Sequence, residues 1–183
     1  MNVGASKPSD AGLYFQWGDT VGYTADQVGT GDGQKKFGWA DYKWSIDGSS
    51  SNFSKYKTEG VTLDLEDDAA NHYMGGSWHM PTPEQIKELT ANTTSTWTTS
   101  DDGVDGRLFT SKSDTSKSIF IPAAGCAQDG SIHNGGGSGY VWSSMLSAGS
   151  VGYGQVLYFL SGGAGLNGIG SRYGGFSVRG VLG

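Results

Sequence analysis

The sequence predicts an α+β fold with two short helices, small antiparallel sheets and long C-terminal loops. Stretches with helix-capping residues lie in the first half, and short β-branched or aromatic segments bounded by turn residues follow them. The last third is rich in glycine and nearly free of charge. With 183 residues, six Trp, nine Tyr and seven Phe, the chain can form one domain over residues 1–183 with a real core.

The first helix is expected at residues 66–73. Glu66, Asp67 and Asp68 would lie in its first turn, where carboxylates complement the positive end of the helix dipole. Gly75 and the glycine after it supply the end of the helix. We interpret the three carboxylates as capping and solvated groups, with a cation site as the alternative.

The second helix is expected to begin after Thr82, which is a good N-cap residue. Pro83 suits the first helical position, and Gln85 completes a Thr-x-x-Gln capping box. Asn92 is the expected end of this helix.

The expected strands are short and rich in β-branched and aromatic residues, which favours antiparallel pairing. They cover residues 13–17, 95–99, 106–111, 118–122, 141–142, 156–160 and 176–181.

The charge pattern limits the expected partners. The net charge is −6, and every acidic residue lies at or before Asp129. This balance argues against nucleic acid and against an anionic membrane surface as partners. No apolar run approaches the roughly 18 residues of a membrane span, so we expect no membrane insertion.

The single cysteine, Cys126, allows neither an intrachain disulfide nor a cysteine-based zinc site, and we expect it to be a buried apolar residue.

The C-terminal third has the composition of a display surface. From Ser131 to Gly183 the only formal charges are Arg172 and Arg179, and 16 of the 32 glycines lie in these 53 residues. Small, uncharged side chains between two ordered-looking segments favour recognition over catalysis. We therefore expect no enzyme activity and no cofactor.

An ordered series of segments runs through nearly the whole chain, and as a set it is fairly specific. The segments are Asn2-Val-Gly-Ala-Ser-Lys-Pro, Tyr14-Phe15-x-Trp17-Gly18, Leu65-Glu-Asp-Asp-Ala-Ala, Gly75-Gly-Ser-Trp-His-Met-Pro-Thr82, Trp97-Thr-Thr, Ser118-Ile-Phe-Ile-Pro-Ala-Ala-Gly125, Tyr140-Val-Trp-Ser-Ser and Ser177-Val-Arg. This series resembles the C-type-lectin-like domains of Bacteroides surface and phage proteins, including the Fibrobacter major paralogous domain.

The resemblance implies a variable protein of a diversity-generating retroelement, in which chosen adenines of a C-terminal coding window are rewritten. Such rewriting of Asn codons does not produce Lys, Glu, Gln, Met or Trp. Residues 147–174 contain no Lys, Glu, Met or Trp and one Gln, Gln155. This agrees with a rewritten window, although an undiversified glycine-rich loop has much the same bias. The resemblance makes residues 140–183 the candidate variable ligand-binding region.

The sequence departs from the family pattern at two places. Gly180 stands where such domains often carry Pro, and one more strand would be expected before Met1, so the N-terminus is a candidate truncation. The N-terminal residues lack the basic stretch followed by an apolar stretch that marks a secretory signal peptide. This favours either assembly from the cytoplasm, as for virion proteins, or removal of an upstream part.

Three chemistries related to this fold or to its residues are disfavoured. Calcium-dependent sugar binding needs clustered oxygen ligands in the long loop, and no acid follows Asp129. The architecturally related sulfatase-activating oxidases use a cysteine pair, which one cysteine cannot provide. His72 and His79 could form a metal site with nearby carboxylates, but packing or capping is the favoured interpretation.

Ser143 and Ser144 follow Trp142 and invite a nucleophile interpretation. No Gly-x-Ser-x-Gly elbow accompanies them, and no acid lies downstream to orient a base. We expect them instead to hydrogen-bond the backbone of the variable loops.

The expected function is recognition of a bacterial cell-surface protein or glycan by a phage receptor-binding protein on the virion, at the tail or surface. The alternatives are a bacterial surface adhesin or lipoprotein domain, and a structural virion decoration domain without variable binding. Because small side chains leave few strong contacts, we expect weak monovalent binding, with several copies together giving avidity.

The expected residues fall into anchors and contacts, with the three tyrosines as the strongest contacts. The anchors are Trp142, Phe159, Ser161, Arg172, Ser177 and Arg179. The ligand contacts are Ser147, Gly149, Ser150, Gly152, Tyr153, Tyr158, Leu160, Gly163, Leu166, Asn167, Ile169 and Tyr173.

Overall fold

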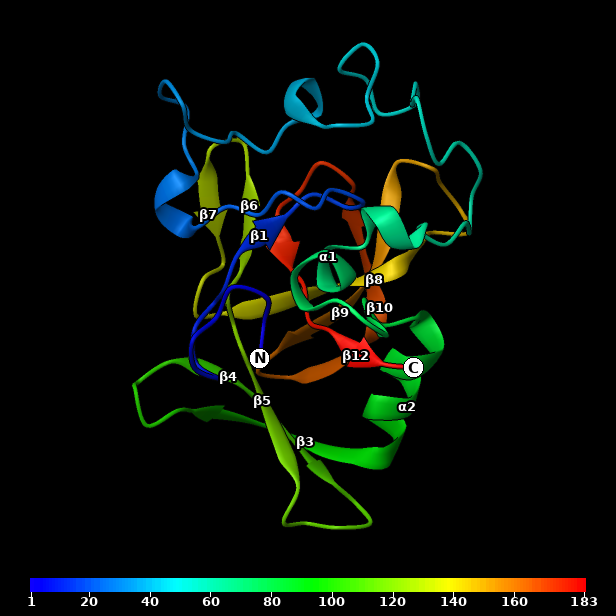
Figure 1. The fold of residues 1–183 in the computed structure, drawn as a ribbon. Coiled ribbons are helices and arrows are strands. Elements are labelled where there is room, and N and C mark those ends of the chain that lie inside the picture. Colours follow the sequence, from blue (N-terminus) through cyan, green and yellow to red (C-terminus); the bar gives the residue numbers. More distant parts are fainter.

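A computed structural model describes residues 1–183, with the side chain of Asn167 excepted. Its centre is a five-stranded sheet in the order β1-β11-β8-β9-β10 (Figure 1). All of its pairings are antiparallel except β11 with β8. The strands are β1 (Tyr14–Phe15), β8 (Ser138–Leu146), β9 (Tyr153–Leu160), β10 (Gly163–Ser171) and β11 (Phe176–Ser177).

Three smaller antiparallel sheets surround the central one. The three-stranded sheet consists of β3 (Thr93–Thr99), β4 (Asp105–Ser111) and β5 (Ser118–Pro122). The two-stranded sheets are β2 (Trp78–His79) with β12 (Val181–Leu182), and β6 (Cys126–Gln128) with β7 (Ser131–His133). The two ends of the chain lie on the same side of the molecule (Figure 1), and Asn2 bridges Arg179.

Two α-helices confirm the α+β class. In α1 (Ala69–Met74), the Asp68 side chain accepts a hydrogen bond from the backbone N–H of Asn71 at 3.0 Å, and Gly75 ends the helix with φ of 69°. Glu66 and Asp67 do not lie in this helix as expected. They belong to a separate 3-10 turn, Leu65–Asp67. Asp68 has an extended backbone and is the N-cap of α1, so the α-helix begins only after it.

The second helix confirms the predicted capping box. In α2 (Pro83–Asn92), the Thr82 hydroxyl accepts the backbone N–H of Gln85 at 3.2 Å. The Gln85 side chain in turn accepts the backbone N–H of Thr82 at 2.9 Å. The capping chemistry alone therefore located the start of this helix. In the described part of the chain, neither helix nor any 3-10 turn has the length and apolar character needed to cross a bilayer.

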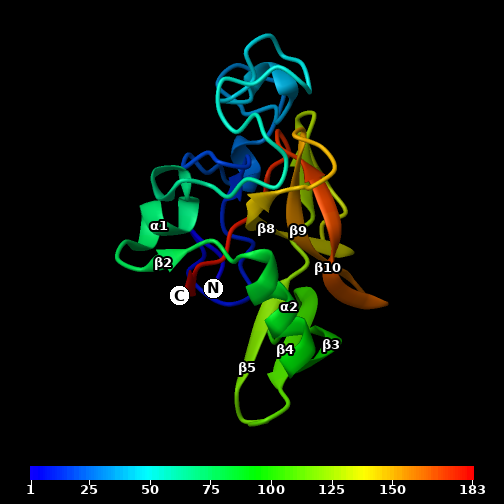
Figure 2. The ribbon, with the colours of Figure 1, turned by 90° about the vertical axis from the view of Figure 1, so that its right-hand side faces the viewer.

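The central sheet is buried on both faces. Trp142 and Val156 on one face pack into a core that includes Phe15 and Phe176. Successive residues of a strand point to opposite faces. Val141 and Leu157 accordingly face a second core, which is completed by α2, β4 and β5. Figure 2 shows α2 and the three-stranded sheet at one end of this layer and irregular residues at the other.

The irregular residues at that other end include two 3-10 turns, Ala25–Gln27 and Trp39–Asp41. The aromatic rings of Trp39, Tyr42 and Phe53 pack against one another within 6.2 Å between ring centres. This aromatic cluster holds the loops against the last strands of the central sheet, because Trp39 also packs on Tyr173 at 4.8 Å.

The expectation of long C-terminal loops was wrong for most of residues 147–174. This segment forms the β9–β10 hairpin, with strands of eight and nine residues. Glycine serves close packing here: a side chain at Gly168 would meet Val156, and one at Gly170 would overlap the Phe176 ring. A glycine-rich composition can thus reflect close approach of neighbours as well as a flexible loop.

Candidate functional site

An open groove lies at the turn end of the β9–β10 hairpin. Its volume is about 410 Å³, which falls within the usual range for ligand sites. Tyr158 and Leu160 form its side-chain walls, and the rest of its lining is glycine and alanine. The complete lining is Tyr158, Leu160, Gly162, Gly163, Ala164 and Gly165. Three of the expected contacts, Tyr158, Leu160 and Gly163, therefore meet in one groove.

The groove wall is held in place by stacked aromatic rings. The Tyr158 ring lies 4.9 Å from Tyr140, and the Tyr140 ring stacks on Phe176 at 5.0 Å. Tyr158 is half-buried as a result, with its ring fixed at the groove. Leu160 is 37% exposed and supplies an apolar side chain at the mouth.

Arg107 holds the end of β9 in place through side-chain hydrogen bonds to backbone carbonyls. One guanidinium nitrogen donates to the Leu160 carbonyl at 2.6 Å, and another donates to the Ser95 carbonyl at 3.0 Å. Arg107 is only 6% exposed, and its burial lowers its pKa. Sequence reasoning missed this residue. A lone arginine between the apolar positions of an expected strand was the available signal.

A second group of expected contacts lies at the opposite end of the hairpin. Tyr153 pairs with Ser171 and Ile169 pairs with Gln155, so Tyr153 and Ile169 are diagonal neighbours on one sheet face. Their exposed fractions are 37% and 58%. Ser147, Gly149 and Ser150 lie on the adjoining connection between β8 and β9, where Gly149 is exposed and the serines are half-buried.

The expected contacts therefore do not form one patch. Tyr153 and Leu160 are seven residues apart on the same strand, which at about 3.3 Å per residue separates them by about 23 Å. Strand alternation also places Tyr158 on the opposite face from Tyr153. Tyr173 lies beyond the end of β10 and is half-buried against Trp39.

Two of the expected roles are corrected by burial. Gly152 is buried and not an exposed contact, because a side chain there would meet the Ser50 carbonyl at 2.9 Å. Ser161 is exposed at the hairpin turn and is not a packing anchor. Leu166 is half-buried against the core that contains Phe159, which leaves less of it for a ligand. Asn167 was also expected to contact ligand, but its side chain lies outside the described residues.

The other expected anchors lie in packed or bonded positions. Trp142 and Phe159 are fully buried, and the Trp142 indole donates to the Phe15 carbonyl at 2.7 Å. Ser177 is 2% exposed in β11. Arg179 is half-buried and donates to the Phe120 carbonyl at 3.1 Å.

Arg172 is fully buried and joins three segments of the chain. It donates to the Tyr42 hydroxyl at 2.8 Å, to the Tyr56 and Val151 carbonyls at 3.0 Å each, and to the Lys55 carbonyl at 3.3 Å. Burial lowers the pKa of its guanidinium, and its hydrogen bond with Tyr42 opposes this shift. Arg172 thus ties the aromatic cluster to the base of the hairpin.

Ser143 and Ser144 bond to backbone groups outside residues 147–174. The Ser143 hydroxyl accepts the Met145 N–H at 3.2 Å. The Ser144 hydroxyl donates to the Pro81 carbonyl at 3.5 Å, which links β8 to the start of α2. Their partners therefore differ from the variable-loop backbone that we expected.

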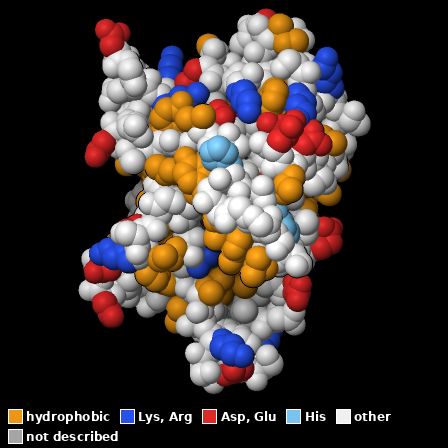
Figure 3. Space-filling view, in the orientation of Figure 1, with side chains coloured by type: hydrophobic (Ala, Val, Ile, Leu, Met, Phe, Trp, Pro, Cys, Tyr) orange, Lys and Arg blue, Asp and Glu red, His pale blue; other side chains and the backbone are white. Residues whose placement is uncertain are grey.

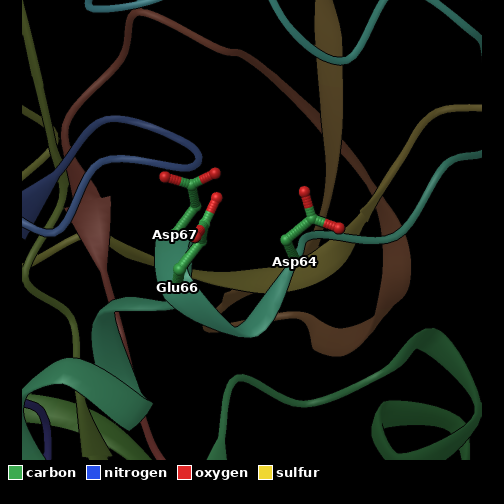
Figure 4. A group of neighbouring side chains, drawn as sticks. All are labelled: Asp64, Glu66 and Asp67. Atoms are coloured by element: carbon green, nitrogen blue, oxygen red, sulfur yellow. The ribbon is translucent and has the colours of Figure 1, made fainter.

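Three carboxylates come close enough together for a cation (Figure 4). They belong to Asp64, Glu66 and Asp67. The Lys55 ammonium lies 2.7, 3.0 and 2.6 Å from them, respectively, so a protein cation already balances this group. Burial raises the pKa of Asp67, but hydrogen bonds from Lys55, Tyr56 and Lys43 outweigh it and leave that pKa lowered.

The histidines lie apart from these carboxylates. His72 is exposed and packs its ring edge-on against Tyr73, while His79 Nδ1 lies 2.8 Å from the Met80 carbonyl. Within the described residues, the carboxylate trio is the one group with metal-ligand spacing, and it includes neither histidine. Cys126 is buried, and its burial raises the pKa of its thiol.

Comparisons with models of protein families, with curated proteins and with solved structures gave no match to this chain.

Proposed function

We propose that this chain is a ligand-binding display protein with a C-type-lectin-like fold, and that it acts as a phage receptor-binding protein of the diversity-generating-retroelement type. Its ligand is a protein or glycan on a bacterial surface. The groove at the turn end of the β9–β10 hairpin carries this proposal, because it combines three of the expected contacts in one concave site.

The chemistry of the groove supports recognition of a neutral, polar or weakly apolar surface. No charged residue lines it, and Tyr158 offers both a ring face and a hydroxyl. Tyrosine gives large contact area at low conformational cost, and contact with the Tyr140 ring reduces that cost further. Gly162 and Gly163 leave backbone groups accessible for hydrogen bonds to a sugar or peptide.

The residues that hold the groove in place are different from the residues at its open edge, such as Gly163. Arg107, Tyr140 and Phe176 hold the hairpin from inside, while Gly163 has open space where a side chain would begin. Rim residues can therefore change without loss of the fold, which is the property that a diversified scaffold requires.

The direct test is binding of the multimerised protein to intact bacterial cells and to an array of bacterial surface glycans. Gly163→Arg should abolish binding by filling the groove, because Gly163 lines it and an added Cβ there meets no atom within 4 Å. Gly137→Arg is the matched control, since Gly137 is exposed, permits a Cβ and does not line the groove. Equal binding by both variants would reject the groove as the site. In that case Gly149→Arg would test the other end of the hairpin in the same assay.

Sequencing many natural copies of the gene tests diversification separately. We expect substitutions at Gly163 in the groove and at Gly149 and Ile169 at the other end of the hairpin. Gly154 and Gly170 should stay constant, because side chains at these two positions would strike buried rings. Uniform codons across 147–174 would instead favour a fixed adhesin or a structural virion domain.

A further inference from the structure

A second cavity lies on another side of the central sheet. It occupies about 310 Å³ between α2, β5, β12 and the inner face of β8 and β9. Figure 3 shows hydrophobic side chains gathered in this region, with Lys or Arg atoms visible among them. The cavity shares no lining residue with the groove at the hairpin turn.

The lining residues of this cavity are mostly apolar; Arg179, Gln85 and the amino group of Met1 supply its main polar groups. Its side chains include Trp78, Ile86, Leu89, Ile119 and Leu157. Aliphatic and indole groups of this kind favour a hydrocarbon chain over a sugar, because they offer few hydrogen bonds. The volume lies at the small end of the range for ligand pockets, about 300–1,000 Å³, and this fits a chain of medium length.

The side-chain cation among the lining residues is Arg179. Its guanidinium donates one hydrogen bond, to the Phe120 carbonyl at 3.1 Å. Within the described residues no carboxylate forms an ion pair with it, and no Asp or Glu lines the cavity. Burial lowers the pKa of Arg179, which reflects the cost of removing its charge from water.

We propose that this cavity binds a medium-chain aliphatic carboxylate, with its chain among the apolar side chains and its carboxylate on Arg179. A guanidinium pairs with a carboxylate through two parallel hydrogen bonds, which no ammonium or hydroxyl can match. The ligand supplies the anion that the fold does not, while its chain removes apolar surface from water. This inference does not depend on the proposed function of the hairpin.

The test is a calorimetric titration of the whole chain with decanoate below its critical micelle concentration. We expect one saturable site. Decanol and decyltrimethylammonium should bind at least about tenfold more weakly, because they lack the anion. The absence of saturable decanoate binding, or equal affinity for decanol, would overturn the proposal.

Variants then locate the site. Arg179→Gln should weaken decanoate binding at least about tenfold and leave decanol binding unchanged, a pattern that unfolding would not produce. Ile119→Glu places a carboxylate at the rim and should also abolish decanoate binding, whereas the control Ile46→Glu adds the same charge at a distant exposed residue. Unchanged decanoate affinity in Arg179→Gln and Ile119→Glu would reject the cavity.

Two further measurements separate this proposal from its competitors. Gly163→Arg should bind decanoate normally, because the two sites share no residue. A concentration-dependent dimer that Ile119→Glu dissociates would assign the cavity to a second copy of the chain and overturn the small-molecule site.

Discussion

The guanidinium carbon of Arg172 lies 4.1 Å from the centre of the Phe53 ring. This contact joins the end of β10 to a loop more than 100 residues earlier in the chain. The arginine is fully buried, yet within the described residues no carboxylate pairs with it; three backbone carbonyls, the Tyr42 hydroxyl and aromatic faces surround it instead. It therefore depends on aromatic rings and peptide dipoles for the stabilisation that water would otherwise give.

Replacing Arg172 by Met should strongly destabilise the protein. The change leaves the carbonyls of Tyr56 and Val151 without their donor, and each such loss costs roughly 1–3 kcal/mol. We expect the free energy of unfolding in urea to fall by about 3 kcal/mol or more. Lys87→Met, at an exposed position of α2, should change it by less than about 0.5 kcal/mol. A small loss in Arg172→Met would show that the aromatic cluster holds the hairpin without it.

The protonation of Asp67 should make the free energy of unfolding depend on pH in the acid range. Its pKa is lowered in the folded chain, from 3.8, because hydrogen bonds from Lys55, Tyr56 and Lys43 outweigh the effect of burial. A lowered folded pKa stabilises the fold above pH 3.8, and this contribution is lost as the pH falls through the folded value. Asp67→Asn should thus be less stable than the wild type at pH 7, and the gap should narrow below about pH 4.

Urea unfolding of both proteins between pH 7 and pH 2.5 measures that gap. Asp32→Asn is the control that removes an exposed loop carboxylate outside this group of ion pairs. A gap for Asp67→Asn that does not change with pH would mean that its charge contributes nothing.

Because of Lys55, added metal ions should not bind to the carboxylates of Asp64, Glu66 and Asp67 in the wild type. Its ammonium already lies within 3.0 Å of all three. The melting temperature of the wild type should therefore not respond to millimolar calcium or to a chelator. Lys55→Met removes the ammonium that Asp64, Glu66 and Asp67 share and leaves only Lys43, which pairs with Asp67 at 3.3 Å. Calcium should then raise the melting temperature of this variant. A calcium response in the wild type would contradict this arrangement.

Glycines of the hairpin should differ sharply in their tolerance of a methyl group. Gly170→Ala would push the Phe176 and Trp142 rings, and overpacking of this kind costs typically about 1–3 kcal/mol. Gly163→Ala meets nothing and should be nearly neutral. Thermal unfolding of the two variants measures the difference. Equal stability would mean that the rings move aside at little cost.

Binding by the isolated monomer should be weak. The groove has two large side chains, Tyr158 and Leu160, and its other lining residues are glycine and alanine, so few groups can act as hot spots. We expect a monovalent Kd on the order of micromolar or weaker, measured by surface plasmon resonance on captured cell-surface material. A tetramer of the same chain should be retained far longer. Nanomolar binding by the monomer would contradict this prediction.

Sequence reasoning succeeded where the signal is local. The Thr82–Gln85 capping box fixed the start of α2, because its hydrogen bonds lie within four residues. The strands at 95–99, 106–111 and 118–122 were likewise found within a few residues of their ends. Nearest-neighbour propensity was enough for these elements.

Sequence reasoning failed where a residue depends on a distant partner. Gly152 was expected to be exposed, but residues far upstream cover it, and Ser161 was expected to be an anchor but lies in an exposed turn. Arg107 was noticeable as a lone arginine in an expected strand, but its partner at the end of β9 lies more than 50 residues downstream and could not be inferred locally. Each of these outcomes is set by long-range packing, which composition does not encode.

The sequence by itself determined the α+β class, the helix caps and a nearly uncharged, glycine-rich C-terminal third. Only the tertiary structure decided that this third is a paired hairpin whose expected contacts divide between two ends and two faces. The physical reason is strand geometry: alternation and a rise of about 3.3 Å per residue separate side chains that are close in sequence. Burial then comes from partners such as Phe53 and Phe176, which only the fold brings to the hairpin.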